Sequence, residues 1–457
     1  MEREKLSSRL GFILLSAGCA IGCGNVWKFP YITGQFGGGM FVLIYLVCLV
    51  LLGLPIMTME FTMGRASQKS PVAAYQVLEP KGSKWHFHGY AAMVGNYLLM
   101  MFYVTVSGWI LYYCYAMAAG MLNGTTEQIS GVFPALQQKP WTMIGFNSVV
   151  VVAGFLICSF KLSKGLEKVT KYMMIALLVI MVVLAIHSFT LEGGKAGLEF
   201  YLKPSIENMK AAGIGNVIVA AMNQSFFTLS LGIGSMAIFG SYIGKERSLM
   251  GESANVIALD TFVAIVAGLI IFPACFAYGV EPDAGPGLIF VTLPNIFKDM
   301  AGGQIWGTLF FVFMMFAAFS TVLAVFENIV AMCMDAFGWN RKKSCLVNGI
   351  AMLFLAVPAV LGFNVLSGFT PLGEGTGIFD LEDFMVSNLL LPLGCLCYTL
   401  FITNKKAFGW KKFTDEANAG KGLKVKSWMR VYMTYILPVI IAAIFVIGII
   451  PFIQKLF

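Results

Sequence analysis

The chain has 457 residues, of which 58% are hydrophobic and 12% are charged, and its mean hydropathy is +0.80. Water-soluble domains carry about a quarter of their residues as charged side chains, so this composition excludes a soluble protein and indicates an integral membrane protein. The formal net charge is +8. The chain has only 3 histidines, which excludes extensive His-rich metal chemistry. We expect the lipid bilayer, and not nucleic acid, as the surroundings of this chain.

Eleven apolar runs are long enough to cross a bilayer as helices. In chain order these predicted spans are 10–31, 41–59, 90–121, 142–158, 172–188, 214–243, 254–280, 305–337, 347–363, 385–402 and 431–452. If the N-terminus is cytoplasmic, 24 of the 31 basic residues fall on the inner side and 7 on the outer side. The positive-inside rule therefore predicts a cytoplasmic N-terminus, and the odd number of spans places the C-terminus outside. We expect a multi-pass protein of a prokaryotic plasma (inner) membrane.

Two of the predicted spans are interrupted near their middle. The first carries Ala20-Ile21-Gly22-Cys23-Gly24-Asn25, and the sixth carries Thr228-Leu229-Ser230-Leu231-Gly232-Ile233-Gly234. Glycine disfavours helix and unpaired backbone groups cannot face lipid, so both breaks should line a cavity. One such break alone is more typical of close helix packing. Two breaks in the first members of two five-span sets indicate an inverted repeat, in which broken helices offer amides to an anion and carbonyls to a cation.

Several short motifs carry a resemblance to a known family. They are Arg9-Leu10-Gly11-Phe12, Gly24-Asn25-Val26-Trp27-Lys28-Phe29-Pro30-Tyr31, Gly37-Gly38-Gly39, Phe226-Phe227-Thr228-Leu229-Ser230-Leu231-Gly232 and Ala317-Ala318-Phe319-Ser320-Thr321. With these motifs the sequence resembles the neurotransmitter:sodium symporter family, in its bacterial amino-acid-transporting branch with eleven helices. The resemblance implies an all-α integral membrane protein with an inverted five-plus-five helix repeat, broken helices one and six, and an eleventh helix.

The predicted organisation is a single polytopic membrane domain over 1–457. Its parts are a first five-helix repeat over 10–188, a second, inverted repeat over 211–402, a basic cytoplasmic loop over 403–430 and an eleventh helix over 431–453.

The resemblance also implies two sodium sites beside the substrate. The first would be formed by four residues, which are Ala20, Asn25, Thr228 and Asp260. The second would be formed by three carbonyls and two hydroxyls, which belong to Gly18, Ile21, Ala317, Ser320 and Thr321. Ligation by oxygen alone suits a hard cation such as Na⁺. A Ser-Thr pair by itself more often bonds back to its own helix, so the resemblance carries the second prediction.

Asp260 departs from the family pattern, which commonly has asparagine at this position. Chloride-dependent members bind chloride nearby through neutral groups that match Tyr45, Gln224 and Ala264. A buried carboxylate needs a partner charge and sodium supplies one, so Asp260 can replace the charge of the anion and we expect no chloride. The alternative is that Asp260 faces a cytoplasmic vestibule and pairs with a lysine or arginine.

The implied substrate is an α-amino acid, whose carboxylate and ammonium groups match the amides and carbonyls of the breaks. Gly22 occupies the position where monoamine transporters place an aspartate, and so leaves room for the substrate carboxylate, which Tyr103 would hold. The full set of expected substrate contacts is Ala20, Gly22, Gly24, Leu99, Tyr103, Phe226, Phe227, Thr228, Ser230, Ile233, Thr321 and Val325. This set contains no charge, so we expect a hydrophobic amino acid, aliphatic or aromatic. A stripe of aromatic residues at helical spacing is also what simple packing produces.

The resemblance places an outer gate at Lys28 and Asp383, closing over Tyr103 and Phe227. Lysine stands where the family usually has arginine. Because an ammonium lacks the bidentate fork of a guanidinium, we expect a looser latch.

The inner gate would pair Arg3 with Asp335, supported by Tyr242. Two further carboxylates, Glu60 and Glu327, lie inside predicted spans, where an acidic residue is a functional candidate by default. We expect Glu60 to brace the break of the first span and Glu327 to lie near the inner vestibule.

The expected function is secondary active transport, in which inward sodium flux drives uptake of a hydrophobic L-amino acid by alternating access. The alternative is a membrane sensor that binds the amino acid with sodium and does not turn over. We do not expect an enzyme, because the three histidines share no metal-ligand spacing with cysteines or carboxylates and no Ser/His/Asp set is visible. The sequence gives no sign of an obligate protein partner.

Overall fold

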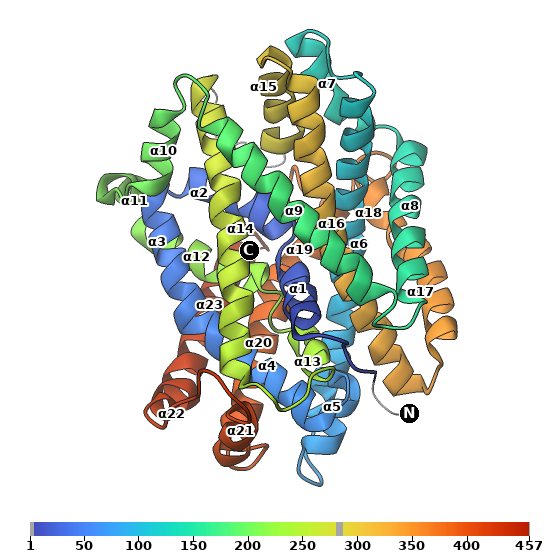
Figure 1. Ribbon diagram of the computed structural model, residues 1–457, viewed down its shortest axis with the longest axis vertical. Coiled ribbons are helices and arrows are strands. Elements are labelled where there is room, and N and C mark those ends of the chain that lie inside the picture. The colour runs from blue at the N-terminus through green and yellow to red at the C-terminus, as the bar shows by residue number, and fades with distance from the viewer. Residues whose placement is uncertain (1–3, 280–286, 457) are drawn as a thin grey trace.

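The computed structural model describes residues 4–279 and 287–456, and throughout these ranges the chain forms helices joined by turns (Figure 1). Nine of the described helical stretches are long and apolar enough to cross a membrane. They are Gly39–Ser67, His86–Ala118, Pro140–Cys158, Leu166–Ser188, Leu249–Ala277, Gly303–Phe337, Arg341–Leu361, Ile378–Thr403 and Met429–Ile450. The pair Arg9–Ala20 and Gly24–Gln35 passes the same test when its two halves are taken together, with a bend of 53° between them.

Most of these stretches are built from more than one helical element. In chain order the elements are α1 (Arg9–Ala20), the π-helical segment η1 (Gly24–Lys28) and α2 (Phe29–Gln35); α3 (Gly39–Cys48), η2 (Leu49–Gly53) and α4 (Leu54–Ser67); α6 (His86–Ala118); α8 (Pro140–Cys158); α9 (Leu166–Ser188); α12 (Ile214–Thr228) and α13 (Ser235–Gly240); α14 (Leu249–Ala277); α16 (Gly303–Phe337); α17 (Arg341–Leu355) and α18 (Val357–Leu361); α19 (Ile378–Phe384), η4 (Met385–Leu390) and α20 (Leu391–Thr403); and α22 (Met429–Val431), η5 (Tyr432–Ile436) and α23 (Leu437–Leu456).

These elements confirm the predicted all-α membrane fold, and each predicted span overlaps a helix or a broken pair of helices. The sixth span differs most from a simple membrane helix. It is divided into α12 with 15 residues and α13 with 6 residues, so neither half reaches the roughly 20 residues that a crossing helix needs. Because the pair cannot cross as one regular helix, the end of α12 and the start of α13 must meet inside the protein.

Shorter helices fill the connections between the spanning elements. They are α5 (Pro71–Leu78), α7 (Thr126–Gln137), α10 (Lys195–Leu202), α11 (Ile206–Ala212), η3 (Leu288–Thr292), α15 (Leu293–Asp299) and α21 (Trp410–Ala417). Figure 1 shows α7 and α15 at one end of the molecule and α5 and α21 at the other end. The segments expected outside and those expected in the cytoplasm therefore lie at opposite ends of the fold.

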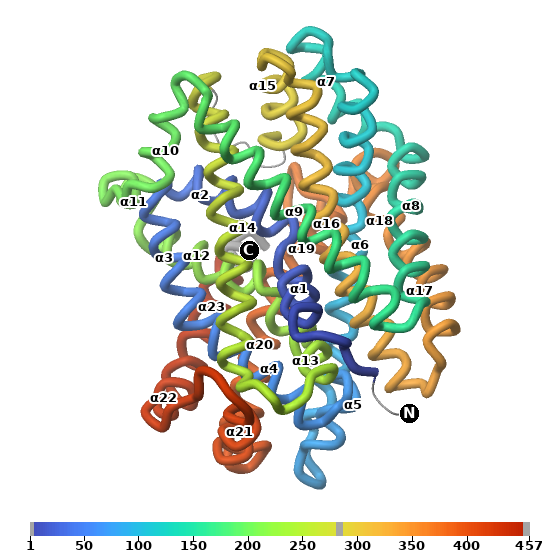
Figure 2. The backbone as a smooth tube through the Cα atoms, viewed as in Figure 1, coloured from blue at the N-terminus to red at the C-terminus, as the bar shows by residue number. Residues whose placement is uncertain are grey.

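The two interrupted spans lie in the middle of the molecule. In Figure 2 the trace of α1 runs beside that of α13, and the two helices are in contact. Glycines let α13 approach α4 closely, as small residues do between membrane helices. A Cβ on Gly64 would meet the Ala237 carbonyl oxygen at 1.7 Å, and one on Gly240 would meet the Phe61 carbonyl oxygen at 2.5 Å. Each close approach fixes the position of the helix-six break relative to α4.

The basic loop 403–430 is held against the rest of the protein by a buried arginine. The Arg65 side chain is 0% exposed, and its Nε donates to Glu416 Oε1 of α21 at 2.7 Å. Its guanidinium also donates to the Arg247 carbonyl at 2.7 Å. The Ser248 amide donates to the Lys421 carbonyl at 3.0 Å. The end of α4, the connection between α13 and α14, and the 403–430 loop are thereby joined at one place.

Candidate ion and substrate site

The break in the first span exposes a short run of backbone groups at the centre of the fold. Helix α1 ends at Ala20, and Ile21 is extended with φ −73° and ψ 99°. The chain resumes a helical path only at Gly24. The Cys23 amide donates to the Tyr103 hydroxyl at 2.9 Å, so α6 meets the break through the tyrosine that the sequence singles out.

The break in the sixth span is a turn over 229–234, in which three residues have positive φ. Gly232 and Gly234 have φ 97° and 78°, a conformation that glycine adopts at little cost. Ser230 has φ 50°, which is uncommon outside glycine. Its hydroxyl donates to the Cys19 carbonyl at 3.2 Å. The strained residue of one break therefore makes direct contact with the other break.

Three of the four residues expected at the first sodium site are joined by hydrogen bonds. Asn25 Nδ2 donates to Asp260 Oδ1 at 2.8 Å, and the Thr228 hydroxyl lies 3.3 Å from Asp260 Oδ2. Asp260 is fully buried in α14. The structure thus brings together residues from both breaks and from the seventh span, while Ala20 lines the adjacent cavity.

The surroundings of Asp260 bear on the alternative that it pairs with a basic residue. Within the described ranges, none of the ion pairs includes Asp260, and its hydrogen-bond partners are neutral side chains.

Two of the residues that match the family's chloride ligands are nearby. The Tyr45 hydroxyl lies beside Thr228 and Asp260, and Gln224 Nε2 donates to the Gly24 carbonyl at 2.8 Å. The third, Ala264, lies one turn further along α14, where its carbonyl is 3.5 Å from the Tyr201 hydroxyl.

All five residues expected at the second sodium site meet between α1 and α16. The Thr321 hydroxyl lies 3.3 Å from the Gly18 carbonyl and 3.3 Å from the Ile21 carbonyl. The Ser320 hydroxyl lies 3.3 Å from the Ile21 carbonyl and 2.9 Å from the Ala317 carbonyl. This is a cluster of oxygens only, which is the donor set that hard cations select.

A small cavity lies between the two oxygen clusters. Its walls are formed by Cys19, Ala20, Gly22, Gly24, Leu99, Tyr103, Phe227, Ser230, Ile233, Thr321, Val386 and Leu391. Nine of the twelve expected substrate contacts line it. The three others are buried elsewhere: the Thr228 hydroxyl faces Asp260, while Phe226 and Val325 belong to the packed core.

Three residues that line the cavity are not among the contacts expected from the sequence. They are Cys19, Val386 and Leu391. The two aliphatic residues come from η4 and the start of α20, where no motif marks them. The cavity volume is about 20 Å³, which holds little more than one water molecule. The walls must therefore move apart to admit an amino acid.

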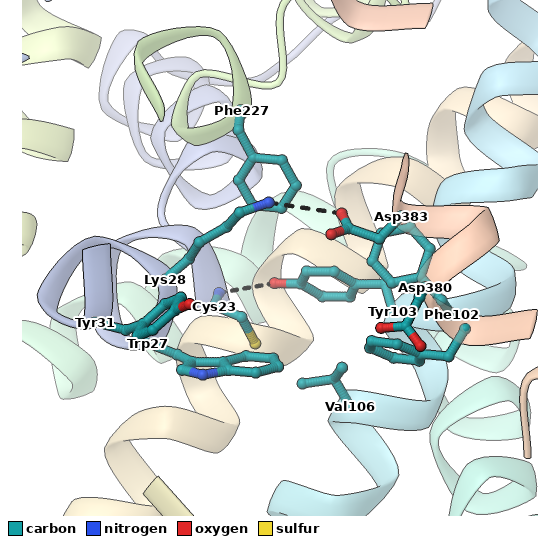
Figure 3. Close-up of a pocket in the computed structure, with 11 residues that line it drawn as sticks. Cys23, Trp27, Lys28, Tyr31, Phe102, Tyr103, Val106, Phe227, Asp380 and Asp383 are labelled. Atoms are coloured by element: carbon teal, nitrogen blue, oxygen red, sulfur yellow. Dashed lines mark hydrogen bonds and ion pairs between the residues drawn. The ribbon is translucent and has the colours of Figure 1, made fainter. Parts of the chain in front are cut away.

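The two residues of the expected outer gate lie on one side of this cavity. Figure 3 shows Lys28 reaching across Phe227 toward Asp383, while Tyr103 points at the backbone of Cys23. Lys28 Nζ is 3.6 Å from Asp383 Oδ1 and 3.9 Å from the centre of the Phe227 ring. Lys28, Asp383 and Phe227 themselves line a larger cavity of about 280 Å³, whose lining also includes Trp27.

The residues of the expected inner gate are only partly within the described ranges. Arg3 lies outside them. Asp335 accepts a hydrogen bond from the Ser70 amide at 2.7 Å and lies 3.8 Å from Lys69 Nζ. The Tyr242 hydroxyl donates to Glu327 Oε1 at 2.7 Å.

Glu327 and Glu60 have different surroundings. Glu327 is fully buried and forms a close ion pair with Arg341, at 2.6 Å between Oε2 and Nη1. Glu60 was expected at the break of the first span, and this prediction is wrong. Its Oε1 accepts a hydrogen bond from the Gly232 amide at 2.6 Å, in the break of the sixth span. The reason is that α4 lies against α13, so the carboxylate reaches the amides exposed by the second break.

Two broken helices that contribute backbone oxygens and hydroxyls to clusters beside a central cavity are typical of ion-coupled secondary transporters. The model of the sodium:neurotransmitter symporter family matches residues 3–130 and 127–457. An uncharacterised sodium-dependent transporter, YhdH of Bacillus subtilis (strain 168), is 34% identical over 98% of both chains. The human sodium- and chloride-dependent GABA transporter 2 is 24% identical over 99% of this chain and 81% of its own.

The comparison with solved structures gives the same result. The crystal structure of MhsT in complex with L-phenylalanine superposes with a TM-score of 0.87 and 37% identity, and the match covers 98% of this chain and 100% of that one. The chain belongs to the sodium:neurotransmitter symporter family, and its relatives are membrane transporters.

Proposed function

We propose that the protein carries a hydrophobic L-amino acid into the cell together with two sodium ions, by alternating access. The observation that carries this proposal is the shared use of the first break. Residues 18–25 contribute to the Asp260 cluster, to the Ser320 and Thr321 cluster and to the cavity between them. Because one segment serves all three sites, a cation at either cluster would help to fix the cavity wall that contacts the substrate.

The lining of the cavity supports an apolar substrate. Its side-chain walls come from Leu99, Phe227, Ile233, Val386 and Leu391, and none of the described residues that line it has a charged side chain. Burying an ionic side chain there would cost several kcal/mol. The similar protein MhsT was crystallised in complex with L-phenylalanine, which is an amino acid of the expected class.

The backbone groups of the two breaks would hold the amino-acid head. Gly22 leaves the space between the Tyr103 and Thr321 hydroxyls open, and a Cβ at this position would lie 2.4 Å from both oxygens. A substrate carboxylate placed there would accept a hydrogen bond from Tyr103. The carbonyls that end α1 and α12 would accept hydrogen bonds from the ammonium group.

We infer that transport does not need chloride. Asp260 supplies a negative charge beside the first cluster, among the positions that match the family's chloride ligands. The cost of burying this carboxylate would be offset by the sodium ion. A second anion in the same place would add like-charge repulsion, because two unit charges 4 Å apart interact by about 4 kcal/mol at an effective dielectric constant of 20.

The membrane arrangement extends this proposal. Residues 10–188 and 211–402 would form two inverted five-helix repeats, followed by the basic 403–430 loop on the cytoplasmic side and the helix over 431–453. The excess of basic residues in the same segments as the N-terminus supports a cytoplasmic N-terminus and an outer C-terminus in a prokaryotic plasma membrane.

The test is uptake of labelled leucine and tryptophan into proteoliposomes with an inward sodium gradient. We expect concentrative uptake of at least one of them, and none when potassium replaces sodium on both sides. Empty liposomes and a charged amino acid such as lysine serve as controls. Sodium-dependent binding without uptake would contradict transport and identify a sensor, whereas uptake that ignores sodium would contradict the coupling.

A further inference from the structure

A chain of buried amide side chains ties the break of the sixth span to the two longest helices. Asn96 of α6 and Asn328 of α16 are both 0% exposed. Asn96 Nδ2 donates to the Ile233 carbonyl at 2.9 Å and to the Ala92 carbonyl at 2.8 Å. Asn328 Nδ2 donates to Asn96 Oδ1 at 3.2 Å and to the Ser235 hydroxyl oxygen at 2.7 Å.

The direction of these hydrogen bonds is fixed by the carbonyls at their end. Backbone carbonyls only accept, so the nitrogen of Asn96 must face Ile233 and its oxygen must face Asn328. The oxygen of Asn96 then requires the nitrogen of Asn328 on its other side. The chain of donors therefore has one orientation, and it holds both ends of the short Ile233–Ser235 segment from two separate helices.

The segment held in this way forms a wall of the cavity. The side chain of Ile233 lines the cavity beside Leu99, which lies one turn along α6 from Gly95. A Cβ on Gly95 would meet Ile233 Cγ2 at 2.9 Å, so this isoleucine lies directly against the backbone of α6. The neighbouring Gly232 is held from the other side by Glu60, through its amide.

We propose that Asn96 and Asn328 are positioning residues that set the size of the substrate cavity by fixing the Ile233 carbonyl. The inference rests on the function proposed above, since it concerns the side-chain end of an amino-acid pocket. With the Asn96 hydrogen bond in place, Ile233 stays close to Leu99 and limits the depth of the cavity. Without it, the glycine-flanked segment can retreat, because Gly232 and Gly234 impose few limits on its backbone.

The test compares two substrates of different size in Asn96→Ala and Asn328→Ala. For each variant the ratio of kcat/KM for tryptophan to that for leucine is measured in proteoliposomes, together with the sodium concentration at half-maximal uptake. We expect the ratio to rise about tenfold in both, which is the range that one or two methylenes produce in an apolar pocket. Half-maximal sodium should stay within about twofold, because neither asparagine contacts the two oxygen clusters.

A double variant separates a connected chain from two independent packing effects. If Asn96 acts on Ile233 partly through Asn328, the double alanine variant should change the ratio no more than the larger single change. Asn147→Ala is the matched control. Asn147 is a buried asparagine of α8 that bonds to Thr105 of α6 at 3.2 Å, away from the cavity, so its loss should leave the ratio unchanged.

Each outcome decides the inference. Folded variants with an unchanged ratio, or a ratio that rises equally in Asn147→Ala, would overturn it. If the alanine variants do not fold, Ser235→Ala removes only the hydroxyl that Asn328 reaches, and an unchanged ratio in that variant would overturn it as well. An unmutated protein that neither binds nor transports amino acids would instead refute the proposed function itself.

Discussion

At the scale of single residues, Thr321 belongs both to the oxygen cluster between α1 and α16 and to the lining of the central cavity. Its hydroxyl lies 3.3 Å from two carbonyls of the first break, and the same residue lines the cavity. A cation held by these carbonyls and a substrate in the cavity would therefore touch the same side chain. This shared contact would link sodium binding directly to amino-acid binding.

Gly22→Ala should weaken amino-acid binding while leaving the protein folded. The new methyl group would lie 2.4 Å from the Thr321 and Tyr103 hydroxyls, in the space assigned to the substrate carboxylate. Overpacking of this kind costs about 1–3 kcal/mol, so we expect affinity to fall by about tenfold or more. The affinity is measured as sodium-dependent binding of labelled leucine to each variant. Gly145→Ala, where a Cβ meets nothing within 4 Å, is the control, and equal affinity in both variants would refute the role of Gly22.

Asp260→Asn should make transport depend on chloride. The amide keeps the shape of the side chain but removes its charge, so a chloride ion must supply the charge that balances sodium. We expect uptake by the unmutated protein to be the same when gluconate replaces chloride, and uptake by the variant to fall severalfold. Asp299→Asn, an exposed carboxylate of α15, should behave like the unmutated protein. Loss of uptake without chloride in the unmutated protein would contradict the assignment.

Residue-level prediction from the sequence works best where a motif marks the position. Asn25, Thr228 and Asp260 are far apart in sequence and are brought together by the fold, as the family resemblance implies. Asn96 and Asn328 escape such reasoning, because a lone asparagine in an apolar helix has no spacing that identifies its partner. The prediction for Glu60 is wrong for a similar reason. The sequence does not show which of the two breaks the helix that carries Glu60 faces.

At the scale of elements, the two breaks follow from local sequence, whereas the small helices between spans do not. Glycines at 22, 24, 232 and 234 interrupt two long apolar runs, and the helices end there. Helices such as α7 and α10 lie in connections too short and too polar to show a clear apolar period. The docking of the 403–430 loop is also invisible in the sequence, because it depends on a contact between Arg65 and Glu416 across 351 residues.

Arg65→Met should lower the stability of the folded protein markedly. The change leaves the Glu416 carboxylate and the backbone carbonyls of Gly244, Arg247 and Glu416 without their buried donor. Breaking a buried ion pair from one side costs about 3 kcal/mol. The midpoint of thermal unfolding in detergent should fall by several degrees. Lys245→Met is the control, because Lys245 contacts the same glutamate from a side chain that is 65% exposed. Similar midpoints for the two variants would contradict a structural role for Arg65.

At the scale of the whole molecule, hydropathy predicts most of the fold. A helix that crosses lipid needs a long apolar run, so each of the eleven predicted spans can be read from the sequence as such a run. What hydropathy cannot supply is the order in which helices meet around the centre. That arrangement comes from close contacts such as those of Gly64 and Gly240 with the backbones of α13 and α4.

Coupling to two ions, as proposed, would have an energetic consequence for the molecule as a transporter. A membrane potential of about 100 mV with a tenfold sodium gradient gives each ion about 2.3 plus 1.4 kcal/mol. Two ions provide about 7.4 kcal/mol, which supports roughly 10⁵-fold accumulation of a neutral amino acid, and one ion supports only a few hundredfold. The number of coupled ions therefore decides how well the cell can scavenge a dilute substrate.

The most direct test is to measure the influx of radiolabelled sodium and of labelled amino acid in the same proteoliposomes at a fixed membrane potential. Two oxygen clusters that share the first break predict two sodium ions for each amino acid carried. Ser320→Ala, which removes one hydroxyl of the second cluster, should raise the sodium concentration needed for half-maximal uptake. A ratio of two in the unmutated protein would support coupling through both clusters. Amino-acid uptake with no accompanying sodium influx would contradict it.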